Sequence, residues 1–417
     1  MTRMTRFAVA LAVAAGGLLA ERTASAQVDC STLPNPIYVT GSSAFVPTMN
    51  AFAAKLAMET TPSTVIYASS SSCQGATAIA NSTALTGTAL TYYNADGTLN
   101  MAGCNITNTT TLADLAVSDV FYASCGTQAP TQPANLADFP GPVQAMEIIV
   151  PLNNGTTTYL TAAEGHDIWG CGVAFMGPAA TDGTFLDFDM AGIFVRGPTS
   201  GSQIITASAI NLDPSAMMGT MVGKSGDMAF GVGNYPVTKS GSVNAIGFLG
   251  ADVFDLDHAL NNQQLTAVPF AATGQTNAYL VDSAQGVPDR QNVRDGHYFP
   301  WGYEHLLATV DTTTKLPTDT KAAKLIGLIT GATTDPTLDY VQLEGKAGTV
   351  PLCAMAVAKA DDSPGYLTVA PTPPTCTCAF QAAALGTAPS GCVACTGGAD
   401  AGTGCTGGKT CQHGFCE

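Results

Sequence analysis

The sequence has few charged residues, and positive charge is the scarcest. Of its 417 residues, 15 are Lys or Arg and 31 are Asp or Glu, which gives a formal net charge of −16. Between Lys55 and Arg196 there is no Lys or Arg at all. Nucleic acids and anionic membrane surfaces are bound through clusters of basic residues, so this composition argues against both as partners.

Long hydrophobic runs are also lacking. The apolar run from Phe7 to Ala20 follows Arg3 and Arg6 and precedes the small residues Ala24-Ser25-Ala26. It is too short to span a membrane, and this order of segments is typical of a secretory signal peptide. We therefore expect residues 1–26 to be a signal peptide and predict no membrane insertion. The mature protein is expected in the periplasm, at the cell surface or in the extracellular medium.

Cysteine is abundant, with 13 residues, which favours an oxidising, exported setting. Six cysteines are spread through the main body, and seven fall within residues 376–417. The stretch APTPPT separates the groups, so we predict a proline-rich linker over residues 361–375 and a disulfide-rich tail over 376–417. Because seven is odd, one tail thiol must pair elsewhere or stay free. A zinc site at Cys392 and Cys395 is the alternative to disulfides there.

Strand-like and helix-like segments alternate in the main body. The apolar runs PIYVTG (36–41), TVIYA (64–68) and GIFVR (192–196) each lead into a polar turn and a helix-like pattern. After the first strand we predict a helix with Ser43 as its N-cap and one buried face, formed by Phe45, Met49, Phe52, Ala53 and Leu56. The alternation predicts an α/β fold with mainly parallel sheets flanked by helices.

Small hydroxyl residues fill three of the turns that follow strands: Gly41-Ser42-Ser43, Ser69 to Ser72, and Thr199-Ser200-Gly201-Ser202. Arg196 stands just before the third turn. In α/β folds, helix N-termini at the carboxyl ends of strands present free N–H groups that bind anions. A guanidinium suits two oxygens of a tetrahedral anion. The pattern predicts an oxyanion site, with serines that merely cap helices as the alternative.

Four of these segments, in order, resemble the ligand-binding segments of phosphate-binding proteins from ABC phosphate transporters: VTGSSAFVPTMNAFA, IYASSSSCQGATAI, LAVSDV and FVRGPTSGSQ. GSVNAIGFLGADVF and DGHYFPWGYEHLL are similar to two later segments of the family. The resemblance covers about residues 35 to 350, with a longer insertion near 80–113. It implies the two-lobed periplasmic binding protein fold of type 2. Lobe I would comprise residues 27–145 and 263–360, and lobe II residues 146–262, with the ligand between them.

The resemblance also implies a set of ligand-binding residues. By position these are Ser42, Ser43, Ala44 and Phe45, then Ser70 and Ser71, then Asp119, and finally Arg196, Ser200, Gly201 and Ser202. Asp119 matches the acidic residue that accepts a proton-bearing oxygen of phosphate, which sulfate lacks. The register of the serine run is open between Ser70 and Ser71. Ala44 stands where the family usually has a threonine.

The clearest departure from the family pattern is Pro198, where the family has an aspartate paired with the arginine. This difference leaves open which anion is bound, and makes a degenerate cleft an alternative. Catalysis has little support, because the sequence contains neither Gly-x-Ser-x-Gly nor Ser-x-x-Lys. His297 and His305 are better explained by packing than as metal ligands.

These observations lead to one preferred function and one alternative. We expect a solute-binding protein, not an enzyme, that captures a small inorganic anion, above all phosphate, for uptake or sensing. No cofactor, metal or catalytic residue is predicted. An ABC permease or a cell-surface component would be its macromolecular partner. The alternative is a surface-displayed interaction protein that keeps the binding-protein scaffold, and a phosphoester hydrolase has the least support.

Overall fold

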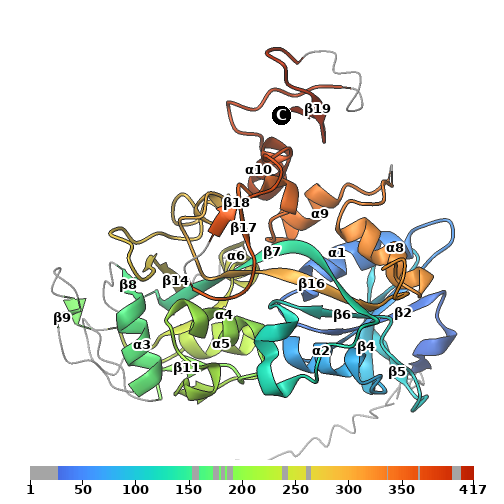
Figure 1. The fold of residues 1–417 in the computed structure, drawn as a ribbon, viewed down its shortest axis with the longest axis horizontal. Helices are drawn as coiled ribbons and strands as arrows, with labels where there is room; N and C mark the ends of the chain where they lie inside the picture. The colour runs from blue at the N-terminus through green and yellow to red at the C-terminus, as the bar shows by residue number, and fades with distance from the viewer. Residues whose placement is uncertain are drawn as a thin grey trace, which may run out of the picture.

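The structure, a computed structural model, describes residues 27–152, 159–171, 178–179, 184–185, 191–236, 243–259, 264–335, 337–364, 367–396 and 405–417. The predicted signal peptide lies outside these residues. The described chain is a mixed α/β fold, as predicted, with a small tail projecting from the body (Figure 1). Among its described helices, none has both the length and the apolar character needed to cross a membrane.

One seven-stranded sheet runs through the body in the order β13-β7-β16-β6-β2-β3, with β14 also paired to β7. Its strands are β2 (Pro36–Gly41), β3 (Thr64–Ser69), β6 (Leu115–Ser118), β7 (Leu136–Pro151), β13 (Gly247–Gly250), β14 (Leu265–Val268) and β16 (Trp301–Thr309). Pairing is parallel between β2 and both β3 and β6, but antiparallel wherever β7 or β16 takes part. Within this sheet, parallel pairing is therefore confined to the strands around β2, and the sheet as a whole is mixed.

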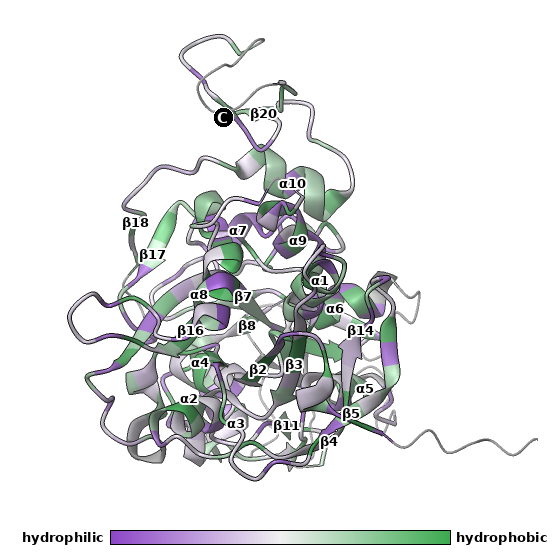
Figure 2. Ribbon diagram, turned by 90° about the vertical axis from the view of Figure 1, so that its right-hand side faces the viewer, coloured by the Kyte–Doolittle hydropathy of each residue, from purple (hydrophilic) through white to green (hydrophobic). Residues whose placement is uncertain are grey.

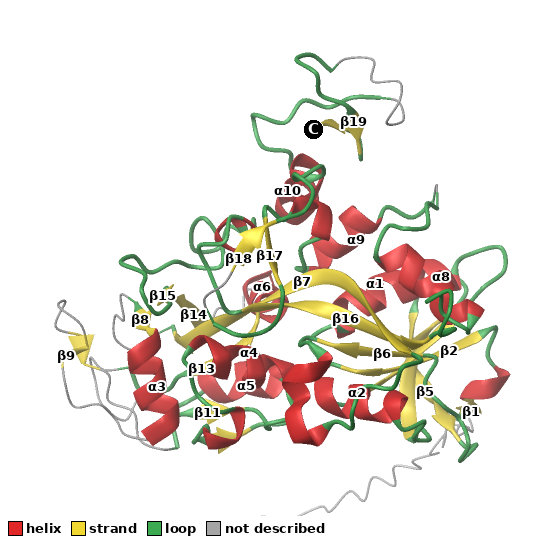
Figure 3. Cartoon of the chain, in the orientation of Figure 1, coloured by secondary structure: helices red, strands yellow, loops and turns green. Residues whose placement is uncertain are grey.

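The long strand β7 joins the two halves of this sheet (Figure 3). Its first part, from Leu136 to Ala145, pairs with β16, and its second part, from Met146 to Pro151, pairs with β13 and β14. The predicted boundary between lobes, at residues 145 and 146, falls inside this strand. Movement of one half of the body against the other must therefore bend or twist β7.

Helices cover both halves of the sheet and bury their apolar faces. They are α1 (Val46–Ala57), α2 (Ser72–Ala80), α3 (Ala162–Cys171), α4 (Gly201–Ala209), α5 (Ser225–Gly233), α6 (Ala251–Ala259) and α8 (Thr320–Ile329). On α1 the predicted face is buried, with Phe52 and Leu56 each 0% exposed. Burial of such side chains contributes about 1.5–3 kcal/mol each. The N-cap is Phe45, not Ser43 as predicted.

Smaller elements complete the body. They are β1 (Val28–Asp29), β4 (Gly87–Tyr93), β5 (Leu99–Ile106), β8 (Leu160–Thr161), β9 (Pro178–Ala179), β10 (Thr184–Phe185), β11 (Phe194–Val195), β12 (Thr220–Met221), β15 (Phe270–Ala271), α7 (Gln291–Arg294) and the 3-10 helices η1 (Cys30–Thr32), η2 (Tyr122–Gln128), η4 (Pro214–Ala216) and η5 (Leu352–Ala354). β1, β4 and β5 form a three-stranded sheet fastened by the Cys30–Cys104 disulfide. The polar insertion expected near 80–113 thus forms a hairpin of its own.

A strap, residues 357–364, crosses the body after η5. It begins with β17 (Val357–Lys359), which pairs with β18 (Leu367–Val369). Lys359 Nζ donates to the carbonyl oxygens of Phe299 and Trp301, and lies 4.4 Å from the centroid of the Trp301 ring. Burial lowers the pKa of Lys359 to about 8.

Asp362 of the strap contacts both halves of the body. Its Oδ2 accepts hydrogen bonds from the hydroxyl of Ser124 at 2.6 Å and from the N–H of Phe121 at 2.9 Å. Its carbonyl oxygen accepts from the hydroxyl of Ser208 on α4. Asp362, which falls in the segment expected to be a linker, is therefore packed against the body.

The tail is held by disulfides, as predicted. Cys353 of the body pairs with Cys376, and the remaining tail pairs are Cys378–Cys392, Cys395–Cys411 and Cys405–Cys416. The odd tail cysteine thus pairs with the body, and Cys392 and Cys395 are both oxidised. Helix α10 (Thr377–Leu385), whose residues are mostly hydrophobic (Figure 2), packs on α9 (Tyr340–Ala347), and β19 (Cys411–Gln412) pairs with β20 (Phe415–Cys416).

Candidate functional site

The first predicted turn follows β2 and lies against β6. Ser42 N–H donates to the carbonyl oxygen of Val117 at 2.9 Å, and Ser42 Oγ accepts from Ala44 N–H at 3.0 Å. Gly41 has φ +120°, and a Cβ there would lie 2.0 Å from the Val117 carbonyl oxygen. Only glycine permits this approach, which fixes Ser42 and Ser43 at the edge of the sheet.

The second predicted turn, after β3, contributes a residue that the sequence did not single out. Ser72 Oγ accepts hydrogen bonds from the N–H of Asp119 at 3.3 Å and of Gly201 at 3.1 Å. Ser71 precedes α2 as its N-cap, and its hydroxyl is buried with no hydrogen-bond partner in the described structure. Ser70 Oγ lies 3.5 Å from Thr40 Oγ instead. Ser72 thus faces the site, and Ser71 stands next to it at the start of α2.

Arg196 is 3% exposed and extends toward the first turn. Its Nη2 donates to Ser43 Oγ at 3.4 Å and to the Gly223 carbonyl at 2.9 Å, while Nη1 donates to Ser225 Oγ at 3.2 Å. Its Nε is buried and has no hydrogen-bond partner among the described residues. Ser225 and Gly223 thus accept hydrogen bonds from Nη1 and Nη2 of Arg196. No aspartate can pair with the arginine from position 198, because that residue is Pro198.

The third hydroxyl turn brings the N-terminus of α4 against Asp119. Ser200 is the N-cap of α4, and Ser200 and Ser202 are both buried. A Cβ at Gly201 would lie 2.5 Å from both Asp119 Oδ2 and Ser72 Oγ. The absence of a side chain at Gly201 is therefore what lets the turn and Asp119 meet.

Asp119 lies at the centre of these turns and is 1% exposed. Burial raises the pKa of Asp119, whereas hydrogen bonds from Ser42 and Ser72 and the charge of Arg196 act in the opposite direction. Its Oδ1 has no hydrogen-bond partner within the described structure. Asp119 therefore keeps one free acceptor in a site that otherwise offers hydroxyls, N–H groups and a guanidinium.

Glu304 on β16 is a further buried carboxyl at this site, and the sequence analysis did not identify it. It is 0% exposed, and its side chain reaches that of Asp119. Burial raises the pKa of Glu304 well above its ordinary value, and the charge of Asp119 raises it further. The one available signal was a glutamate inside the otherwise apolar or aromatic stretch FPWGYEHLL.

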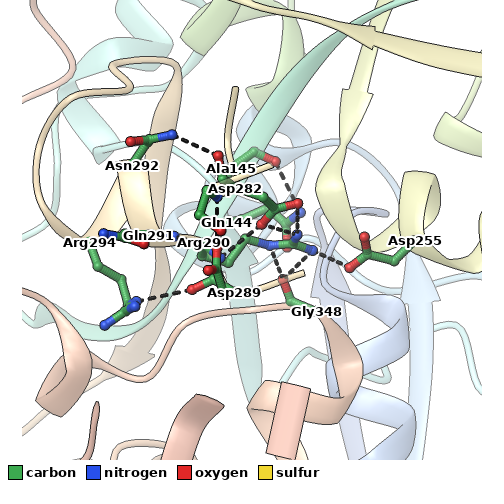
Figure 4. Close-up of polar contacts among 11 residues, drawn as sticks. Gln144, Ala145, Asp255, Asp282, Asp289, Arg290, Gln291, Asn292, Arg294 and Gly348 are labelled. Carbon is green, nitrogen blue, oxygen red and sulfur yellow. Dashed lines mark hydrogen bonds and ion pairs between the residues drawn. The ribbon is translucent and has the colours of Figure 1, made fainter. Parts of the chain in front are cut away.

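Arg290 forms a separate charge cluster with Asp282 and Asp255 (Figure 4). Its Nη1 donates to both carboxylate oxygens of Asp282, at 2.9 and 3.0 Å, and its Nη2 pairs with Asp255. Its Nε donates to the Gly348 carbonyl at 3.3 Å. Because every guanidinium nitrogen is engaged, Arg290 has a structural role, whereas Arg196 keeps an unpaired nitrogen.

No family model and no curated protein sequence matches the chain. Among solved structures, it is similar to a candidate phosphate ABC transporter substrate-binding protein from Clostridium perfringens with bound phosphate, at 12% identity over 76% of this chain and 99% of that one, with a TM-score of 0.49. An ABC-type phosphate transport receptor from Vibrio cholerae is similar at 15% identity over 75% and 99% of the two chains, with a TM-score of 0.47. A phosphate-binding protein from Stenotrophomonas maltophilia is similar at 12% identity over 76% of this chain and 90% of that one, with a TM-score of 0.44.

Proposed function

We propose that the protein is an exported solute-binding protein that captures a tetrahedral oxyanion, above all phosphate, for uptake or sensing. The observation that carries this proposal is Arg196, buried among hydroxyl-bearing turns with Nε unpaired. In the described part of the chain no ion pair engages this guanidinium. A buried charge is costly unless it is paired, so an anion at this position would stabilise the site.

The surroundings of Arg196 suit a tetrahedral anion. Helices α2 and α4 both begin here, and helix N-termini carry partial positive charge and unpaired N–H groups. Ser43 and Ser71 add hydroxyl groups, and a hydroxyl can donate to an anion oxygen. These donors come from turns far apart in the sequence, as expected for a site between two lobes.

Asp119 is the group that would favour phosphate over sulfate. Its buried Oδ1 needs a hydrogen-bond donor. Phosphate carries a proton on at least one oxygen near neutral pH and can supply that donor, whereas sulfate cannot. Sulfate would instead place unshielded negative charge against the carboxylate.

Calorimetric titration with phosphate, arsenate and sulfate tests this function. We expect phosphate and arsenate to release heat and sulfate to bind at least about tenfold more weakly. Arg196→Ala should abolish binding and ligand-induced thermal stabilisation, because the anion loses its only full positive charge. Lys55→Ala, at an exposed position on α1, removes the same charge and should bind like the parent protein. Equal binding by both variants would contradict the proposal.

A surface-displayed interaction protein with a degenerate cleft is the second candidate. The tail favours it, because the Cys353–Cys376 disulfide fixes the tail to the body and Val393 remains 57% exposed. In this case an extracellular component, and not an ABC permease, would be the partner. If the calorimetric titrations with phosphate, arsenate and sulfate all show no heat of binding, this second function would be favoured.

A further inference from the structure

Glu304 and Asp119 lie side by side in the interior of the protein, because β16 pairs antiparallel with β6 with His305 opposite Ser118, and their carboxyl groups contact each other. Glu304 is 0% exposed and Asp119 is 1% exposed. Both oxygens of Glu304 and Oδ1 of Asp119 find no hydrogen-bond donor in the described structure. Ionised carboxylates only accept hydrogen bonds, so two of them in contact cannot satisfy each other. A single proton between them converts the contact into a hydrogen bond.

The backbone of β16 brings the two groups together. A Cβ at Gly302 would lie 2.1 Å from the carbonyl oxygen of Asp119, so this strand passes directly against the site. Glu304, two residues later, lies on the same face of the strand. Opposite Glu304 the register with β7 shifts by one residue, because Tyr303 pairs with Val143 but His305 pairs with Pro140. The extra residue of this β-bulge is on β7, so β16 itself keeps its alternation.

The groups around Glu304 leave it without a cation. Asp119 and Asp252 both raise the pKa of Glu304 by their charge, after burial. The hydroxyl of Tyr67 on β3 donates to the Ser42 carbonyl, and burial and the charge of Glu304 raise the pKa of this phenol well above its ordinary value, so it stays neutral. The charge of Arg196 acts on Asp119, whose pKa it lowers.

We propose that Glu304 and Asp119 share one proton at the base of the oxyanion site, and that Glu304 thereby determines the pH range over which the site binds its anion. This inference rests on the proposed function. With the proton in place, the pair carries one negative charge instead of two, and Asp119 Oδ1 has two lone pairs, so it can accept both the shared proton and a proton of the ligand. Loss of the proton leaves two buried carboxylates against the incoming anion, so affinity falls.

Phosphate binding from pH 5 to pH 10 tests the proposal in the parent protein, Glu304→Gln and Asp252→Asn. Glutamine keeps the shape, stays neutral and can donate to Asp119. The ratio of parent Kd to Glu304→Gln Kd should be constant at low pH and rise about tenfold per pH unit once the pair ionises. The ionisation of phosphate itself affects each protein alike and cancels in this ratio. Asp252→Asn should keep the rise but move its onset to lower pH, because the charge of Asp252 raises the pKa of Glu304.

Parallel profiles for the parent protein and Glu304→Gln would overturn the role of Glu304 while leaving the proposed function intact. If no protein binds phosphate at any pH, the proposed function fails, and infrared spectroscopy still decides the shared proton. The parent spectrum at neutral pH should contain a protonated carboxyl band that is missing from Glu304→Gln, or from Glu304→Met if the first variant does not fold. No difference in this band would overturn the proposal.

Discussion

The hydroxyl of Ser72 accepts a hydrogen bond from the backbone N–H of Gly201, 129 residues further along the chain. The same oxygen accepts from the N–H of Asp119. One serine side chain therefore joins the N-terminus of α2, the end of β6 and the N-terminus of α4. These are the segments from which we propose that the oxyanion site is built.

Replacement of Ser72 by alanine should weaken phosphate binding. It leaves the buried N–H groups of Asp119 and Gly201 without this acceptor, at a cost of about 1–3 kcal/mol. We expect about a tenfold or larger rise in Kd, measured by calorimetric titration. Ser69→Ala, at the exposed end of β3, is the matched control and should bind like the parent. Equal affinity of the two variants would show that Ser72 does not hold the site together.

A methyl group at Gly201 should separate the segments that form the site. Its Cβ would lie 2.5 Å from Asp119 Oδ2 and Ser72 Oγ, closer than real contacts allow. Gly201→Ala should therefore lose at least about 100-fold in phosphate affinity, equivalent to about 3 kcal/mol, while circular dichroism shows a folded protein. A Cβ at Gly226 on α5 would meet nothing within 4 Å, so Gly226→Ala should bind normally. Unchanged binding in Gly201→Ala would mean that the closed arrangement is not the binding form.

Loss of Arg290 should destabilise the whole body. Removing one partner of a buried ion pair leaves the others uncompensated, here Asp282 and Asp255. We expect Arg290→Met to lower the free energy of unfolding by about 3–5 kcal/mol in denaturant titrations. The partly exposed pair of Lys324 with Glu59 is the comparison, and Lys324→Met should cost at most about 1 kcal/mol. Similar losses in both variants would contradict the assignment of Arg290 as the structural arginine.

The stability of the protein should fall as pH rises through the range in which Asp252 ionises. Burial raises the pKa of Asp252 from 3.8 to about 7. Below pH 4 the carboxyl of Asp252 is protonated in both the folded and the unfolded state, so its ionisation does not yet reduce the free energy of unfolding. Between pH 4 and pH 7 only the unfolded state releases the proton, so stability is lost at about 1.4 kcal/mol per pH unit.

Asp252→Asn should flatten this part of the stability profile, measured as the denaturation midpoint at each pH. The variant keeps an oxygen for Gln144 Nε2, which donates to Asp252 Oδ1 at 2.8 Å. Asp96→Asn provides a control of opposite sign, because hydrogen bonds from Thr98 lower the pKa of Asp96 and favour the folded state at higher pH. An unchanged slope in Asp252→Asn would show that another group is responsible.

Much of the fold could be predicted from local patterns. The strands at 36–41 and 64–69 and the buried face of α1 follow from apolar periodicity, which depends on neighbouring residues only. The mixed pairing of the sheet could not be predicted this way. It depends on β7 and β16, whose partner strands lie far away in the sequence. A local sequence pattern does not determine whether such strands pair parallel or antiparallel.

The site shows the same division. Arg196 stood out because positive charge is so scarce around it, and the structure brings it to Ser43, 153 residues earlier in the chain. Ser72 was missed because four serines in succession look alike, and only the end of β3 at Ser69 determines which of them face inward. Glu304 was missed because its role depends on its contact with Asp119. That contact arises from the pairing of β16 with β6, which lie far apart in the sequence.

The strap has a consequence for how long a ligand would stay bound. Asp362 touches Ser124 on one side of the body and Ser208 on the other. Any opening that draws these two serines apart must first break one of those bonds. The residence time of a captured ion would then depend on a segment that never touches it, and the off-rate could be tuned there without altering a single group that coordinates the ion.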